Sequence, residues 1–189
     1  LTVAGNVSVD GGTIKLDGNY PVGSRNVALG DTALDSITSA SDVVAIGNAA
    51  LTSNTTGEDQ VAIGSFSLDA NTTGNFNTAV GFASLSSNTT ASNNTAVGYQ
   101  AGYANTGDKN TFVGKESGVA NTSGRLNTML GQRAGKSNTT ANSNTFVGQA
   151  AGEDNTTGAF NTAIGDQSLK SNTTASNNTA VGYQAAYSN

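Results

Sequence analysis

The chain has 189 residues, of which 24 are glycine, only 11% are charged, and none is cysteine, histidine or tryptophan. Its net charge of −5 argues against a nucleic-acid partner, because no basic stripe is present to neutralise phosphates. The lack of cysteine and histidine excludes disulfides, Ser-His-Asp and Cys-His catalysis and most zinc sites, so we expect a non-enzymatic protein without a cofactor. No apolar run approaches the roughly 20 residues that cross a bilayer, and membrane insertion is not expected.

The first 21 residues differ in pattern from the rest of the chain. Apolar residues alternate with other residues from Leu1 to Val9, which is typical of a half-buried strand, and a Gly-Gly turn and a second short apolar segment follow. The only proline, Pro21, ends this part. We predict that residues 1–21 form an N-terminal β cap or the end of a preceding module, and residues 22–189 a β-roll repeat domain. No signal-peptide pattern is present at the start. Since the chain begins with Leu rather than Met and stops at Asn189, we interpret it as a fragment or a processed piece.

A five-residue unit, typified by the Asn-Thr-Ala-Val-Gly segment from Asn94 to Gly98, recurs through the rest of the chain. Its ten glycines are separated by 17 residues in eight intervals and by 16 in the remaining one, which lacks a Thr before Gly107 in a predicted turn. The ten are Gly30, Gly47, Gly64, Gly81, Gly98, Gly114, Gly131, Gly148, Gly165 and Gly182. This period predicts an all-β parallel solenoid, or β-roll, with ten coils of about 17 residues, each with two short strands and two turns.

The positions of each coil can be numbered from its repeat glycine, taken as position 0. Position −1 is always Leu, Ile or Val and position −3 is Val or Thr, which predicts a short strand with an apolar stripe. Positions +3 and −7 are always small, as in tight corners or close contacts between coils. We predict that Thr95 and Val97 line the interior and that Gly98 turns the corner. Position +7 is Asn in nine coils, where the side chains can bond the local backbone or form ladders between coils.

Residue size is exchanged between two positions along the chain. Position −2 is Ala in most coils but large in three central ones, whereas position +4 is mostly Leu toward the ends and Gly in four central coils. The large residues are Phe112, Met129 and Phe146, and the glycines are Gly102, Gly118, Gly135 and Gly152. Because interiors are packed to a nearly constant density, we predict that these two positions share one compartment.

Each coil offers few apolar side chains for a core, so several chains packed side by side would cover a face that one thin solenoid leaves open. The segments Val43 to Gly47 and Gln60 to Gly64 resemble the recurring Val-Ala-Ile-Gly motif of trimeric autotransporter adhesin heads, the YadA-type left-handed parallel β-roll. The segment from Asn94 to Gly102 is similar to repeats in phage tail-fibre and related virion proteins. The resemblance covers residues 22–189.

This resemblance implies a homotrimer of β-rolls, intertwined or side by side, in a fibre exposed outside the cell or the virion. It implies a structural or adhesive segment that takes part in attachment to a host or surface, with a host-cell glycan or protein as a further partner. A phage tail fibre and a bacterial adhesin head both stay open, and the Asn-Thr-Ala-Val-Gly-Tyr-Gln form of the repeat favours the phage fibre.

The alternative is an ice-binding or carbohydrate-binding solenoid. The threonines at position −3 form a rank that an ice-binding face requires, but their register with the apolar stripe favours burial. Tyr99, Tyr103, Tyr183 and Tyr187 are candidate surface contacts that could stack on sugars, with packing at an edge as the competing interpretation. The acids, including Glu153, are interpreted as solvated, and the Asn-x-Ser/Thr sequences as turns rather than glycosylation sites.

Overall fold

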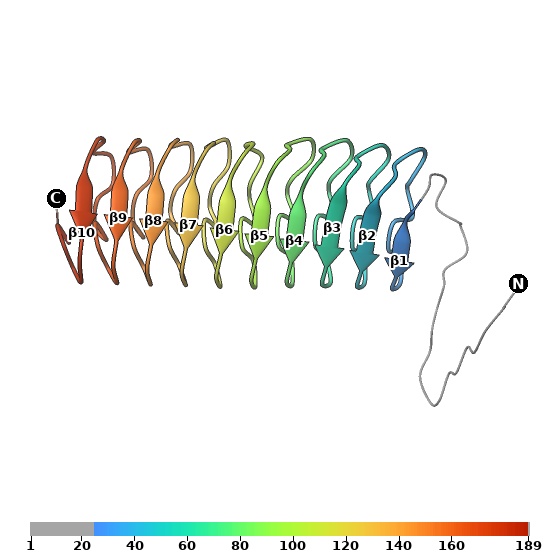
Figure 1. Cartoon of the computed structure of the whole chain (residues 1–189), viewed down its shortest axis with the longest axis horizontal. Coiled ribbons are helices and arrows are strands. Elements are labelled where there is room, and N and C mark those ends of the chain that lie inside the picture. The colour runs from blue at the N-terminus through green and yellow to red at the C-terminus, as the bar shows by residue number, and fades with distance from the viewer. Residues whose placement is uncertain (1–24, 189) are drawn as a thin grey trace, which may run out of the picture.

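The computed structural model describes residues 25–188, so the predicted N-terminal cap and Asn189 lie outside the described residues. In this range ten short parallel strands lie side by side in chain order and form one sheet along a rod (Figure 1). The strands are β1 (Val27–Leu29), β2 (Val43–Ile46), β3 (Gln60–Ile63), β4 (Thr78–Val80), β5 (Thr95–Val97), β6 (Thr111–Val113), β7 (Thr128–Leu130), β8 (Thr145–Val147), β9 (Thr162–Ile164) and β10 (Thr179–Val181). The predicted all-β parallel solenoid is confirmed. Residues 25–188 contain no helix long and apolar enough to span a membrane.

Every strand pairs with the same positions of the next coil. Thr78 is the partner of Thr95 across a 17-residue step, and Thr95 is the partner of Thr111 across the single 16-residue step. The missing residue therefore falls outside the strands, as predicted. At the usual strand spacing of about 4.8 Å, ten coils make a rod about 45 Å long.

Each coil contains one strand, so the prediction of two strands per coil is wrong. The side opposite the sheet is made of turns, in which positions +2 and +4 have positive φ angles, such as 59° at Phe66 and 50° at Leu68. These angles are incompatible with a strand. The turns of successive coils are nevertheless hydrogen-bonded to one another, for example from the Leu68 amide to the Ser84 carbonyl oxygen at 3.0 Å.

The prediction that Thr95 and Val97 line the interior is also wrong. Ala96 is fully buried, whereas Thr95 is half-buried and Val97 is exposed on the outer surface of the sheet. Because side chains alternate across a strand, positions −2 and −4 share the inner face and positions −1 and −3 share the outer one. The coil is narrow, so its strand presents Ala inward and its β-branched residues outward. Gly98 does turn the corner as predicted, with a φ of +137°.

The exchange of size between positions −2 and +4 is confirmed. A Cβ added to Gly102 would lie 2.5 Å from Cδ2 of Phe112, and one added to Gly118 would also meet the Phe112 ring. Gly102 belongs to the coil before Phe112 and Gly118 to the same coil. The residue at −2 thus packs over position +4 of its own coil and of the preceding one, which explains why three large residues require four glycines.

The asparagines at position +7 form a buried ladder along the rod. The Asn138 Nδ2 group donates to Asn121 Oδ1 at 2.7 Å, and the Asn155 Nδ2 group donates to Asn138 Oδ1 at 2.9 Å. Each also bonds its own turn, as Asn155 Nδ2 does with the Gly158 carbonyl at 2.9 Å. These asparagines are buried, so the Asn-x-Ser/Thr sequences at Asn138 and Asn155 are inaccessible for glycosylation in the folded chain.

A second ladder runs through the asparagines at position −4. The Asn127 Nδ2 group donates to the Ala141 carbonyl at 2.9 Å, and Asn127 Oδ1 accepts the backbone N–H of Asn144 at 3.0 Å. One amide side chain therefore joins two points of the following coil. Together the two ladders satisfy polar groups inside a rod that has few apolar side chains to bury.

The 16-residue step interrupts the position +7 ladder and removes one of the two bonds of the position −4 ladder, in which Asn94 Oδ1 still accepts the backbone N–H of Asn110 at 2.9 Å. Asn88 Oδ1 and Asn94 Nδ2 are buried and find no hydrogen-bond partner in the described part of the chain. The Gly107 carbonyl, which corresponds to the usual acceptor for Asn94, instead accepts from Asn105 at 2.8 Å and from Asn110 at 3.2 Å.

Insertion of one Thr between Thr106 and Gly107 should therefore stabilise the chain. The insertion restores the 17-residue turn and gives Asn88 and Asn94 the partners that their counterparts have. Since an unsatisfied buried polar group costs about 1–3 kcal/mol, we expect the free energy of unfolding in denaturant titrations to rise by about that amount. An unchanged or lower value would contradict this explanation of the two unpaired atoms.

Candidate binding surfaces

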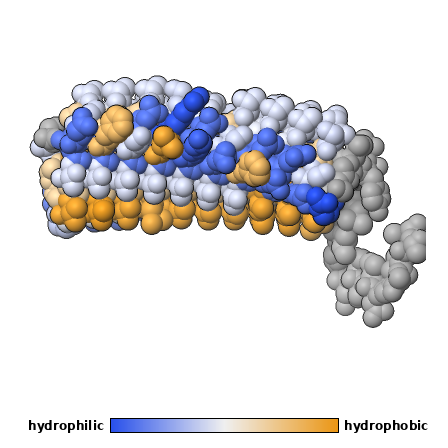
Figure 2. Space-filling view, turned by 45° about the horizontal axis from the view of Figure 1, so that its top comes forward, coloured by the Kyte–Doolittle hydropathy of each residue, from blue (hydrophilic) through white to orange (hydrophobic). Residues whose placement is uncertain are grey.

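The outer surface of the sheet, here called the strand face, consists of the outward residues at positions −1 and −3. Position −1 forms an unbroken hydrophobic rank along the rod, visible as a continuous row in Figure 2. The rank comprises Leu29, Ile46, Ile63, Val80, Val97, Val113, Leu130, Val147, Ile164 and Val181. Every member is half-buried or exposed, with Leu130 44% exposed. The rank is a row of aliphatic side chains that the single chain leaves uncovered.

A second rank lies beside it at position −3 on the strand face. Seven successive coils carry Thr there, and the first three carry Val. The threonines are Thr78, Thr95, Thr111, Thr128, Thr145, Thr162 and Thr179, each paired in register with its neighbours. Their expected burial is not found, since Thr128 and Thr179 are exposed and the others half-buried. The strand face therefore presents hydroxyl groups and aliphatic groups in two parallel rows.

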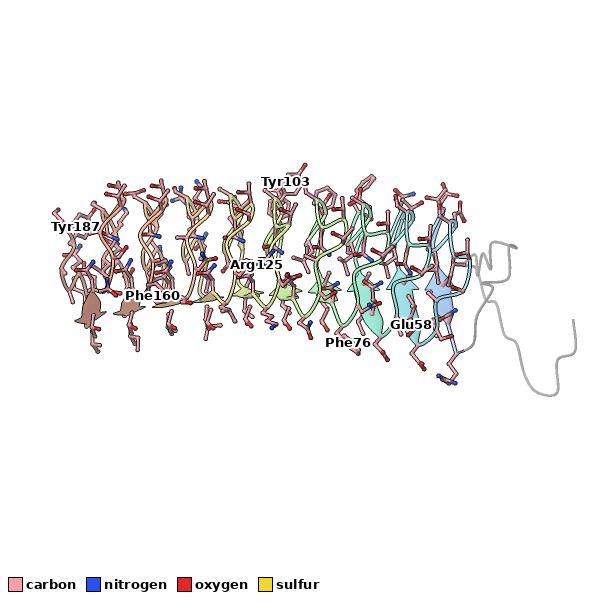
Figure 3. All side chains as sticks on the ribbon, turned by 90° about the horizontal axis from the view of Figure 1, so that it is seen from above. Glu58, Phe76, Tyr103, Arg125, Phe160 and Tyr187 are labelled. Carbon is pink, nitrogen blue, oxygen red and sulfur yellow. The ribbon has the colours of Figure 1, made fainter. Side chains whose placement is uncertain are left out.

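Three large apolar residues flank the strand face at position −5. Phe76, Leu126 and Phe160 are 58%, 57% and 61% exposed, and Figure 3 shows Phe76 and Phe160 on the strand side of the rod. Their φ angles are 57°, 60° and 57°, a region that bulky residues rarely adopt. Sequence reasoning missed these three residues. Their contrast with the polar residues at the same position of the other seven coils could have indicated them.

The tyrosines predicted as surface contacts lie on other sides of the rod. Tyr99 is 46% exposed and stacks on Phe82 with ring centroids 5.6 Å apart, and Phe82 meets Phe66 edge to face at 5.9 Å. Lys115 lies over the Tyr99 ring at 5.9 Å. The structure thus joins Tyr99 to two phenylalanines that sequence reasoning did not single out.

The other three tyrosines have different surroundings. Tyr103 is 40% exposed and lines a hollow of about 280 Å³. Tyr183 is strongly exposed, and Tyr187 carries the Lys170 ammonium over its ring at 5.8 Å. The four residues therefore do not form one surface. They lie in two separate coils, with Tyr99 and Tyr103 in the coil of β5 and Tyr183 and Tyr187 in the coil of β10.

Glu153 is buried, so its interpretation as a solvated acid is wrong. Its two carboxylate oxygens lie 3.1 Å from Arg133 Nε and 3.5 Å from Lys170 Nζ. The Glu153 carboxylate, and after it Tyr187, raise the pKa of Lys170 above its ordinary value. A cation from the coil on each side compensates for the burial of this charge. Glu153 therefore has a structural role in holding three successive coils together.

No group of three or more His, Cys, Asp or Glu side chains within residues 25–188 is arranged to hold a metal ion. Comparison of the chain with protein-family models, with curated proteins and with solved structures finds no match.

Proposed function

We propose that this chain is a non-enzymatic structural or adhesive segment of a trimeric surface fibre, in which three copies pack through their strand faces. The observation that carries the proposal is the unbroken aliphatic rank at position −1 along all ten coils. A contiguous exposed apolar patch of this extent is rare in a monomer and is typical of an interaction surface.

The folded coil itself does not require this rank. The core of each coil is filled by positions −2, +3 and +4 and by the two asparagine ladders, and position −1 lies outside it. An aliphatic residue in all ten coils at an outward position therefore has a use outside the single chain. Phe76, Leu126 and Phe160 add three exposed apolar side chains that flank the strand face at position −5.

A second copy of the same chain fits this surface. A partner must present apolar groups at the strand spacing of about 4.8 Å over ten coils, and another copy does so in register. The rank carries no charge, so equivalent ranks can face one another around an axis without repulsion. The resemblance to adhesin heads and phage tail fibres supports three copies around that axis.

The repeat supports a fibre located outside the cell or on a virion and used in host or surface attachment. The segment from Ser87 to Ala101 recurs letter for letter from Ser171 to Ala185, so coils can be added by copying. A rod that spaces or presents an attachment site changes its length in this way. The form of the repeat favours a phage tail fibre over a bacterial adhesin head.

Substitution Leu130→Glu should dissociate the trimer. It places three carboxylates near one axis in an apolar contact, where desolvation and mutual repulsion both oppose association. Gln132→Glu is the matched control, because Gln132 is exposed in the same coil and lies outside the strand face. Size-exclusion chromatography with light scattering should give one protomer for Leu130→Glu and three for Gln132→Glu. Equal masses for the two variants would contradict association through the strand face.

The outward Thr rank favours ice binding as a second candidate function. Seven hydroxyl groups repeat in register beside an aliphatic rank, and the expected burial that argued against this function is not found. Both functions use the strand face, so they exclude each other for the same copy. Thermal hysteresis of the wild-type chain, lost in Thr128→Tyr, would support ice binding, and its absence in the wild type would remove that candidate.

A further inference from the structure

We infer that the hollow beside Tyr103 is a binding site for one neutral pyranose ring of a carbohydrate. The hollow is lined by Phe66, Asp69, Phe82, Ala83, Ser86, Gln100 and Tyr103, from the coils of β3, β4 and β5. Figure 3 shows Tyr103 on the side of the rod away from the strands, so the site stays open when the strand face is covered. The inference does not depend on the number of chains in the fibre.

The hollow results from one coil with small residues between two coils with large ones. Stacked coils bring equivalent positions into columns, and positions +2 and +5 form two neighbouring columns on this side. The coil of β4 contributes Ala83 and Ser86 to these columns, whereas the coil of β3 contributes Phe66 and Asp69. The coil of β5 contributes Gln100 and Tyr103 on the other side. The hollow is therefore a notch one coil wide, called the notch below, with the Ala83 and Ser86 side chains as its floor.

The rings of this notch suit the apolar face of a sugar. Phe66, Phe82 and Tyr103 are each between 40% and 46% exposed, so their rings are open to a ligand rather than buried in the core. The edge-to-face contact between Phe66 and Phe82 holds those two rings in place before a ligand arrives. Rigid aromatic side chains provide a large contact area at low cost in conformational entropy.

Polar groups in the same notch suit the hydroxyl groups of a sugar. The Asp69 carboxylate, the Gln100 amide and the Ser86 hydroxyl all line it. Asp69 Oδ1 is covered and has no hydrogen-bond partner within residues 25–188. A covered carboxylate oxygen without a partner is stabilised when a ligand hydroxyl group donates a hydrogen bond to it. The notch therefore combines an apolar surface with a few convergent polar groups, as ligand sites do.

Volume and charge define the class of ligand. A hollow of about 280 Å³ lies just below the range of roughly 300–1,000 Å³ typical of drug-sized ligands, which indicates a single ring rather than several. Asp69 disfavours an acidic sugar, and the chain as a whole has a net charge of −5. A neutral pyranose at the end of a glycan, or as one unit in a chain, meets both conditions.

The duplicated coil of β10 provides an internal control. Tyr183, Gln184 and Tyr187 repeat the side chains found at Tyr99, Gln100 and Tyr103. The preceding coil, however, has Gln167 and Lys170 where the coil of β4 has Ala83 and Ser86. Gln184 Nε2 donates to Gln167 Oε1 at 3.0 Å, and Lys170 lies over the Tyr187 ring, so these larger side chains occupy the corresponding space.

The test is saturation-transfer difference NMR with the methyl β-glycosides of glucose, galactose, mannose and N-acetylglucosamine, and with methyl β-glucuronide as an acidic match to the glucoside. The proteins are the wild type, Tyr103→Ala, Ser86→Tyr and Tyr187→Ala. Ser86→Tyr fills the notch and replaces only the Ser86 hydroxyl among the lining groups, and the same position already carries Tyr in the coils of β5 and β10. It keeps the test valid even if Tyr103→Ala fails to fold.

We expect at least one neutral glycoside to receive saturation on the ring protons of its apolar face in the wild type. Tyr103→Ala and Ser86→Tyr should weaken that binding at least about tenfold, while Tyr187→Ala leaves it unchanged. The glucuronide should bind more weakly than the glucoside. No transfer to any of the four neutral glycosides, or equal binding by the wild type and Ser86→Tyr, would overturn the site.

Discussion

Gly98→Ala is expected to prevent the chain from folding as one rod. A Cβ at this residue would lie 2.6 Å from the backbone carbonyl oxygen of Gly114 in the next coil, and backbone atoms cannot move aside as a flexible side chain can. The φ of +137° adds strain for any residue other than glycine. Together, strain and overlap should cost at least about 4 kcal/mol. Thermal unfolding followed by circular dichroism should show either no folded state or a large drop in the midpoint temperature.

Gly182→Ala separates the two causes. Gly182 has a similar φ of +126°, but it lies in the last of the described coils, and among residues 25–188 an added Cβ would meet only Ala185 at 4.0 Å. This variant should lose only the strain contribution, about 1–3 kcal/mol. If Gly98→Ala and Gly182→Ala destabilise the chain equally, contact between the repeat glycines of successive coils is not the reason for their spacing.

Gly102→Leu is the substitution with the second large expected effect. Its Cβ would lie 2.5 Å from Phe112 Cδ2 and 3.1 Å from Leu85 Cδ2. The backbone itself accepts Leu, because Leu85 occupies the same position of the preceding coil with a φ of 51°. Overpacking in a dense core should therefore account for most of the loss, which we expect to be about 3 kcal/mol. Denaturant titration of the variant measures the loss directly.

Phe112→Ala should reverse most of that loss. Alone, it leaves a cavity in the core and should cost about 3–5 kcal/mol. Combined with Gly102→Leu, it gives residues 96, 102 and 112 the Ala, Leu and Ala that coils nearer the N-terminus have at the equivalent positions. The border between coils with Leu at position +4 and coils with Gly there then moves by one coil. The double variant should be more stable than either single variant. Additive losses would show that positions −2 and +4 do not share a compartment.

The period of the repeat was sufficient to predict the parallel solenoid and its register. The size exchange between positions −2 and +4 predicted a shared compartment, because at constant packing density a larger residue at one position requires a smaller residue at the other. The orientation of the strand was not predictable in the same way. Alternation shows that Thr95 and Val97 share one face, but an aliphatic rank looks the same whether it faces the interior or a partner chain.

The two candidate surfaces depend on relations between coils rather than on any single coil. Phe66, Ser86 and Tyr103 are 37 residues apart at most, and they meet because equivalent positions stack in columns. The burial of the Glu153 carboxylate depends on the same stacking, since Arg133 and Lys170 come from the neighbouring coils. Reading the columns of the repeat across coils would have indicated the notch at Ala83.

Sedimentation equilibrium of the unaltered chain tests the proposed trimer most directly. The protomer has a mass of 18.8 kDa, so three copies packed through their strand faces should give about 56 kDa at micromolar concentration. A stable species of 18.8 kDa over that concentration range would contradict the trimer and leave the strand face open.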